Sequence, residues 1–165
     1  MSRMSERSIV SDDVFGFAPD EVVLDEPTRA ARLKWVVIVD GDIPAGRMVN
    51  AVACIAASTG QAVTGIIGPE APDASGHLHP GLPWAGCTIL HATAHQLAEL
   101  RAKAVSSEGV LVTDMPMIAQ TNRVYAEYMA ELAETKPADL ATCAVSIVGP
   151  RNRVSKLVKG LDLLS

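Results

Sequence analysis

Residues 35–60 constrain the fold more than any other part of the chain. They open with a continuous apolar run at residues 35–39, which is too short for a core helix and rich in β-branched residues. Such a run is typical of a strand that is buried on both faces of a sheet. Asp40-Gly41-Asp42 then has turn chemistry, and apolar residues recur at helical spacing over residues 46–58. The stretch therefore predicts strand, short loop and helix, the building unit of an α/β fold.

The rest of the chain continues this alternation of strands and helices. Thr93 and Gln96 match a capping box, which marks the start of a helix. Residues 69–83 are rich in proline and are expected to form a long loop. Further strands are expected at residues 61–68, 87–90, 110–113 and 144–148, and further helices at residues 121–134 and after residue 150. The pattern predicts a three-layer α/β/α sandwich around a mixed, mostly parallel sheet of four to five strands.

Domain organisation follows from composition. Residues 1–33 are expected to form an N-terminal arm, of which residues 1–13 have the composition of a disordered segment, and residues 34–165 one α/β domain. The start lacks the apolar segment of a signal peptide, and no apolar run approaches the roughly 18 residues that a membrane helix needs. We therefore expect a cytoplasmic protein that does not enter a membrane. Its three cysteines show no C-x-x-C pattern and are expected to be reduced and buried: Cys54, Cys87 and Cys143.

Charge argues against one class of partner. The net charge is −5, and only residues 149–165 are basic, with four basic residues against one acidic residue. Proteins that bind nucleic acids normally carry a broad basic surface. Nucleic acid is therefore a disfavoured partner, although the C-terminal bases leave it open; the simpler interpretation of this segment is a solvated helix face.

Three segments together resemble the type II peptidyl-tRNA hydrolase fold: residues 35–57, 94–114 and 144–164. The chain resembles more closely an uncharacterised bacterial branch of this fold, known as domain of unknown function 2000. The shared motifs are D-x-P-x-G at residues 42–46, His-Pro-Gly at residues 79–81, and Asp-x-Pro with Ala-Gln-Thr within residues 114–121. The resemblance covers roughly residues 33–165 and implies a peptidyl-tRNA hydrolase II-like fold.

The resemblance also implies catalytic positions. The hydrolases use a lysine after the first strand, an aspartate after a later strand and a threonine shortly after that aspartate; Arg47, Asp114 and Thr121 stand at these places. Arginine does not readily release its proton, so Arg47 is expected to bind or orient an anion. Asp114 is then the candidate general base; its alternative roles are to hold Arg47 in place or to cap its own turn. The alternative role of Thr121 is to cap the helix that follows it.

Further residues are candidates for ligand binding beside Arg47: Asp42, Asn50, His79 and Gln120. Arg47 and Asn50 each have a structural alternative. Arg47 could pair with an aspartate of the preceding turn, and Asn50 could support the loop after Asp114. His79 is expected to shape a loop that covers the pocket.

No metal or cofactor is expected. The four histidines have no cysteine or carboxylate at ligand spacing, and no glycine-rich phosphate-binding or nucleophile-elbow motif occurs.

The sequence is compatible with three functions. The first is a hydrolase-like site acting on an acyl ester or amide of a small or nucleotide-linked substrate. The second is a protein that binds a small anion or nucleotide-like ligand without chemistry. The third is a homodimeric interaction module whose dimer surface contains Tyr125, Tyr128 and Met129.

Overall fold

A computed structural model describes residues 14–165, and its centre is a five-stranded sheet of order β5-β6-β1-β4-β7. The strands are β1 (Leu33–Asp40), β4 (Thr88–Ala92), β5 (Leu111–Pro116), β6 (Thr142–Pro150) and β7 (Asp162–Leu163). β1 pairs in parallel with β4, whereas the pairs β1–β6, β5–β6 and β4–β7 are antiparallel. The sheet is mixed and five-stranded, as the sequence predicts.

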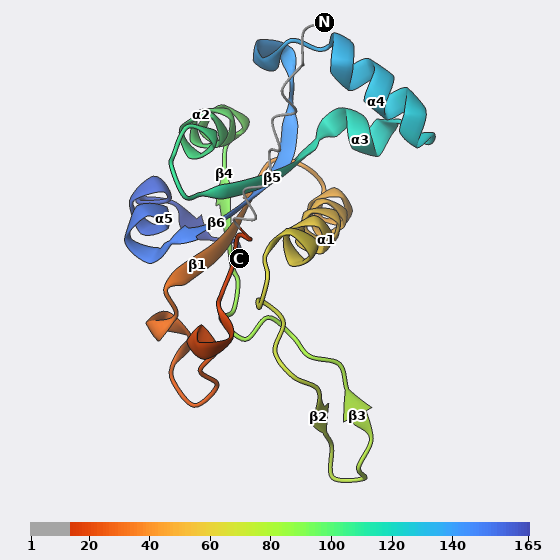
Figure 1. Cartoon of the computed structure of the whole chain (residues 1–165). Helices are drawn as coiled ribbons and strands as arrows, with labels where there is room; N and C mark the ends of the chain where they lie inside the picture. Colours follow the sequence, from red (N-terminus) through yellow and green to blue (C-terminus); the bar gives the residue numbers. More distant parts are fainter. Residues whose placement is uncertain (1–13) are drawn as a thin grey trace, which may run out of the picture.

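Helices cover both faces of this sheet, with α1 on one face and α2 and α5 on the other (Figure 1). Their bounds are α1 (Ala45–Ala62), α2 (Ala94–Val105), α3 (Met117–Thr121), α4 (Tyr125–Glu134) and α5 (Arg151–Leu157). Alternate residues of β1 serve the two cores: Val37 packs on the α1 side and Ile38 on the α2 and α5 side, and both are fully buried. The predicted three-layer α/β/α arrangement is confirmed.

The sheet is less parallel than predicted, because β6 lies between β1 and β5 and runs against both. A continuous apolar run reports burial on both faces, which the helices provide here. It does not report the direction of the neighbouring strands.

Two predicted element boundaries were wrong. α1 continues to Ala62, and residues 61–68 hold only the isolated bridges of Thr64 and Ile67 instead of a strand. The helix predicted at residues 121–134 is divided into α3 and α4. Thr121 ends α3 and donates its hydroxyl to the Ile118 carbonyl at 3.2 Å, so it is not an N-cap. Pro116 precedes α3 and starts it earlier than the apolar periodicity indicates.

The predicted capping box of α2 is confirmed. The Gln96 backbone amide donates to Thr93 Oγ1 at 3.3 Å, and the Thr93 amide donates to Gln96 Oε1 at 2.9 Å. This reciprocal pair satisfies two free amides at the start of the helix.

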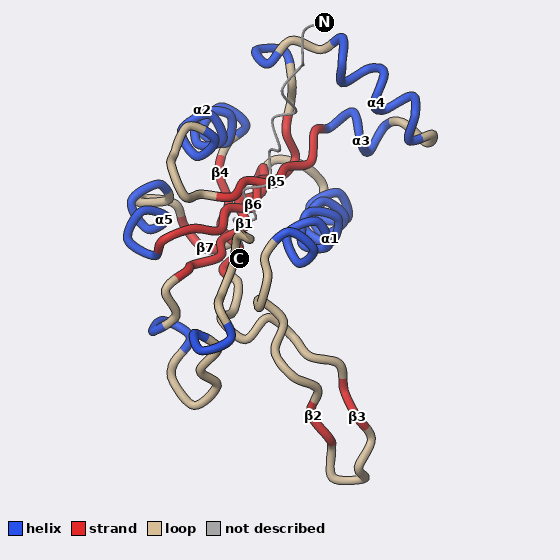
Figure 2. The backbone as a smooth tube through the Cα atoms, in the orientation of Figure 1, coloured by secondary structure: helices blue, strands red, loops and turns tan. Residues whose placement is uncertain are grey.

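The proline-rich segment contains a small hairpin of β2 (Ala71–Pro72) and β3 (Leu78–His79), which projects from the body of the protein (Figures 1 and 2). Near the start of the described chain, Phe17 is buried and its ring lies 4.8 Å from that of Trp84. The disorder expected for residues 1–13 lies outside the described residues. None of the helices within residues 14–165 is long and apolar enough to cross a membrane.

Only one of the three cysteines is buried. Cys143 lies in β6 and is inaccessible, but Cys54 and Cys87 are exposed, so the expectation that all three are buried was wrong. Cys54 lies on an exposed side of α1. The amino-acid composition alone does not show which side of a helix is exposed.

Candidate functional site

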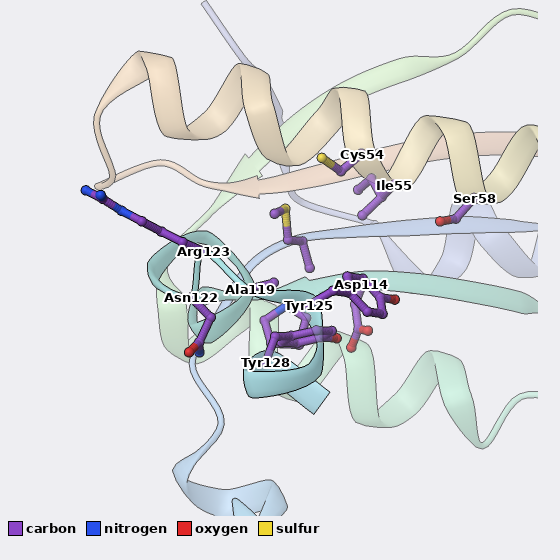
Figure 3. Close-up of a pocket in the computed structure, with 11 residues that line it drawn as sticks. Cys54, Ile55, Ser58, Asp114, Ala119, Asn122, Arg123, Tyr125 and Tyr128 are labelled. Atoms are coloured by element: carbon purple, nitrogen blue, oxygen red, sulfur yellow. The ribbon is translucent and has the colours of Figure 1, made fainter. Parts of the chain in front are cut away.

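A cavity of about 360 Å³ lies between α1 and the segment formed by β5, α3 and α4 (Figure 3). We call it the α1–α4 groove. Its apolar lining comes from Ile55 of α1, Met115 and Pro116 of β5, and Ala119 of α3. Its polar and aromatic lining comes from Cys54, Ser58, Asp114, Asn122, Arg123, Tyr125 and Tyr128.

Local sequence features build this groove. Cys54 and Ser58 are four residues apart in α1, so they present their side chains on the same face of the helix. On the opposite wall, β5 ends at Pro116 and the chain passes at once into α3, which carries α4 beyond the end of the sheet (Figure 1). α4 has no buried residue, so its aromatic side chains remain free to line the groove.

Asp114 forms an ion pair that the sequence analysis missed. Arg101 of α2 donates from Nε to Asp114 Oδ2, and the Asp114 side chain is 20% exposed. The carboxylate is therefore held by a cation from the other face of the sheet. A base that is already engaged by an arginine is a weaker candidate for proton abstraction. The interval of 13 residues between the two partners gives no local signal of this contact.

Tyr125 and Tyr128 form the aromatic wall, with ring centres 5.4 Å apart and planes at 69°. Burial, then the neighbouring Tyr125 and Asp114, raise the pKa of the Tyr128 phenol. Tyr128 therefore stays protonated at neutral pH and can donate a hydrogen bond into the groove.

Gln120 connects α3 to the first turns of α1. Its Nε2 donates to the Arg47 carbonyl at 2.8 Å and to Asn50 Oδ1 at 3.1 Å. The Cys143 thiol donates to Gln120 Oε1 at 3.4 Å, and burial raises the pKa of that thiol against the opposing influence of Arg47. Asn50 and Gln120 thus come together as ligand-site candidates, but both amides are used to hold α3 against α1.

Arg47 and Arg123 are both exposed, and within residues 14–165 neither forms an ion pair with a carboxylate. Asp40, considered above as a partner of Arg47, instead accepts a hydrogen bond from the Asp42 amide at 3.0 Å. Figure 3 shows Arg123 extending from the groove, away from the tyrosines and toward the N-terminal end of α1 in that view. These two guanidinium groups can accept an anion.

The other predicted site residues lie apart. Asp42 lines a different cavity, together with His91 and Thr93, at the carboxyl ends of β1 and β4. His79 lies in the projecting hairpin and bonds to Asp73 at 3.2 Å. The hairpin follows the C-terminal end of α1, whereas Arg47 is in the first turn of that helix.

Arg47, Asp114 and Thr121 do not form one contact cluster in the described chain. Asp114 lines the groove beside Ile55, which is about 12 Å along α1 from Arg47 at 1.5 Å per residue. Thr121 is exposed and bonded to its own helix. In the same part of the chain, no group of three histidine, cysteine or acidic side chains could hold a metal ion.

Comparison with known proteins gives the family. The family described as "Protein of unknown function (DUF2000)" matches residues 33–165. The chain belongs to this family. The match to DUF2000 confirms that part of the expected resemblance. No curated protein matches the sequence significantly.

The DUF2000 chain is also similar to a solved structure, that of the protein of unknown function Atu0240 from Agrobacterium tumefaciens strain C58. The TM-score is 0.69 at 17% sequence identity, over 81% of this chain and 98% of the other. At this identity the likeness supports the fold alone. The expected homodimer and cytoplasmic location of the DUF2000 protein stay predictions.

Proposed function

We propose that this DUF2000 protein binds a small, anionic, nucleotide-like ligand in the α1–α4 groove. The observation that carries the proposal is that one groove is lined both by an aromatic wall, Tyr125 and Tyr128, and by Arg123, an arginine that no carboxylate of the described chain neutralises. A flat ring packs well on tyrosine side chains. A guanidinium group matches the geometry of a phosphate or carboxylate.

The size and lining of the groove support a small organic ligand. About 360 Å³ lies within the range of small-molecule sites, and such sites combine an apolar floor with a few polar groups. The buried Met115 and Pro116 supply the floor, and the Tyr128 phenol supplies a donor. Gln120 holds α3 against α1 at one side, which keeps the two walls at a fixed separation before a ligand arrives.

A hydrolase is the second candidate function, which the resemblance of the sequence to the type II peptidyl-tRNA hydrolases implies. One structural observation favours it: Asp114 and Tyr128, an acceptor and a donor of protons, line the same groove. The Arg101–Asp114 ion pair weighs against it, because Asp114 is then not a free base. Binding without chemistry therefore fits the groove better.

Calorimetric titration with adenosine monophosphate tests the binding proposal, with adenosine as the ligand control. We expect the nucleotide to bind more tightly than adenosine, because only the nucleotide carries an anion for Arg123. Replacing Arg123 with alanine is expected to weaken nucleotide binding about tenfold or more, since a hydrogen bond to a charged group contributes roughly 1.5–3 kcal/mol.

Arg29→Ala provides the matched control, because Arg29 is also exposed and lies in the short turn Thr28–Ala30, outside the groove. The affinity of the Arg29→Ala variant for the nucleotide is expected to equal that of the unmodified protein. Equal affinity of the Arg123→Ala variant, or equal binding of adenosine, would contradict the proposal. Hydrolysis of an N-acetylaminoacyl ester of adenosine that disappears in Asp114→Asn would instead establish the hydrolase.

A further inference from the structure

A second cavity lies on the other face of the sheet, between the C-terminal end of α2 and α5. Its volume is about 910 Å³, and four cationic side chains line it: Lys103, Arg153, Lys156 and Lys159. We call it the basic hollow. Figure 1 shows α2 and α5 together on the face opposite α1, so the basic hollow is separate from the α1–α4 groove.

The basic hollow concentrates positive charge in an acidic protein. The whole chain has 14 basic residues and a net charge of −5, so four cations around one cavity are a local excess. The lining includes a single acidic residue, Glu108. Across residues 14–165, none of the four cations forms an ion pair with a carboxylate. The positive charge is therefore available to a ligand.

The cations are attached to a firmly packed element. Val154 and Val158 anchor the segment in the core with exposures of 0% and 7%. Arg151 fixes its start by donating to the carbonyls of Ala31 and Thr28 at 2.9 and 3.0 Å. The basic hollow is thus not the surface of a loose tail, and its charges are partly arranged before binding.

Arg153 is positioned further by a bond across the basic hollow. Its Nη1 donates to the Glu108 carbonyl, in the loop after α2. Arg153, Lys156 and Lys159 follow at intervals of three residues, which places Arg153 and Lys156 on one side of α5 and Lys159 just after it. Lys103 approaches from the last turn of α2.

A solvated helix face is the simpler explanation, but it does not account for this arrangement. Like charges at this spacing on a helix repel one another and lower the stability of the folded protein. The cations also line one open hollow, in which Ser107 and Asn152 are additional hydrogen-bonding groups. An anion in the cavity would relieve the repulsion and use these groups.

We propose that the basic hollow binds a compact ligand carrying several phosphate groups. Lysine serves as a point charge for phosphate, and arginine adds a bidentate contact. The volume matches a small-molecule site better than a long nucleic acid, which would need a broad basic surface. The ligand class is therefore an oligophosphate group, either free or attached to a small molecule.

Calorimetry with inorganic tripolyphosphate in 50 mM sodium chloride, a concentration chosen for weak screening, tests the proposal. We expect saturable binding of one tripolyphosphate per chain, at least tenfold weaker in the double variant Lys156→Gln/Lys159→Gln. The double variant Arg29→Gln/Lys136→Gln removes two exposed charges elsewhere and is expected to bind normally. Sodium chloride added to the same ionic strength is expected to produce no saturable signal.

Three further measurements distinguish binding in the basic hollow from unfolding of the variant, from binding in the α1–α4 groove and from nucleic-acid binding. The Lys156→Gln/Lys159→Gln variant is expected to be at least as heat-stable as the unmodified protein, so a loss of binding would not reflect unfolding. Arg123→Ala is expected to bind tripolyphosphate normally, because Arg123 lies in the other cavity. No binding in 50 mM salt, or equal weakening in both double variants, would overturn the proposal. Binding of a 20-nucleotide RNA without binding of tripolyphosphate would also overturn it, in favour of a nucleic-acid surface.

Discussion

Replacing Thr59 with valine is expected to lower the free energy of unfolding by about 2 kcal/mol, because it removes the hydrogen bonds of a fully buried hydroxyl group. Thr59 is fully buried in α1 and donates to the Ile55 carbonyl at 2.7 Å. Its oxygen also lies 2.8 Å from Ser146 Oγ and 2.9 Å from Thr113 Oγ1. Valine has nearly the same volume as threonine but lacks the hydroxyl group that bonds to Ile55, Thr113 and Ser146.

Thermal unfolding followed by circular dichroism measures this effect, and a chain of this size is expected to lose about 4–8 °C in melting temperature. Thr121→Val is the control, because Thr121 also bonds a carbonyl of its own helix but is exposed to water. Its cost is expected to stay within about 0.5 kcal/mol. Equal costs for the two variants would show that the buried network adds nothing.

Replacing Gly16 with alanine is expected to have a larger effect, about 3 kcal/mol, from steric overlap and backbone strain together. Gly16 has a φ of 147°, and a Cβ atom there would lie 2.2 Å from the Thr64 carbonyl oxygen. The overlap would break the bridge between Gly16 and Thr64, beside the buried Phe17. Hydrogen exchange of the Phe17 amide, which donates to Thr64 at 2.8 Å, reports this release directly.

Gly46→Ala is the matched control for this substitution. Gly46 lies in the first turn of α1, and a Cβ atom there would meet nothing within 4 Å. Alanine is expected to stabilise the helix by about 0.5–1 kcal/mol. A Gly16→Ala variant with unchanged exchange at Phe17 would contradict the close approach to Thr64.

The sequence correctly predicted the elements that are determined by residues close together in the chain. The capping box of Thr93 and Gln96 forms as expected, since its partners are three residues apart. The buried run of β1 was also evident, because every residue from Val36 to Val39 is apolar and fully buried. The direction of β6 and the break after Thr121 were not evident. Both depend on how distant segments pack, which periodicity does not encode.

The candidate site depended even more on distant contacts. The Arg101–Asp114 pair joins α2 to β5, and Gln120 reaches Arg47 across 73 residues. Sequence motifs singled out Arg47, Asn50, Asp114 and Gln120 as candidates, but they did not indicate that Gln120 contacts Arg47 and Asn50 whereas Asp114 pairs with Arg101. Arg47 lies in the first turn of α1, whereas Asp114 of β5 lies beside Ile55, about two turns further along that helix.

The central claim is that a nucleotide-like anion occupies the α1–α4 groove, and methyl NMR of methionine-labelled protein tests it most directly. Met115 lines the groove, whereas Met48 packs against the core of the α1 face. Single Met→Leu variants assign the two signals. On titration with adenosine monophosphate, the Met115 methyl signal is expected to shift with a saturating curve while the Met48 signal stays in place. A nucleotide that binds without moving the Met115 signal, or no shift at any concentration, would contradict the claim.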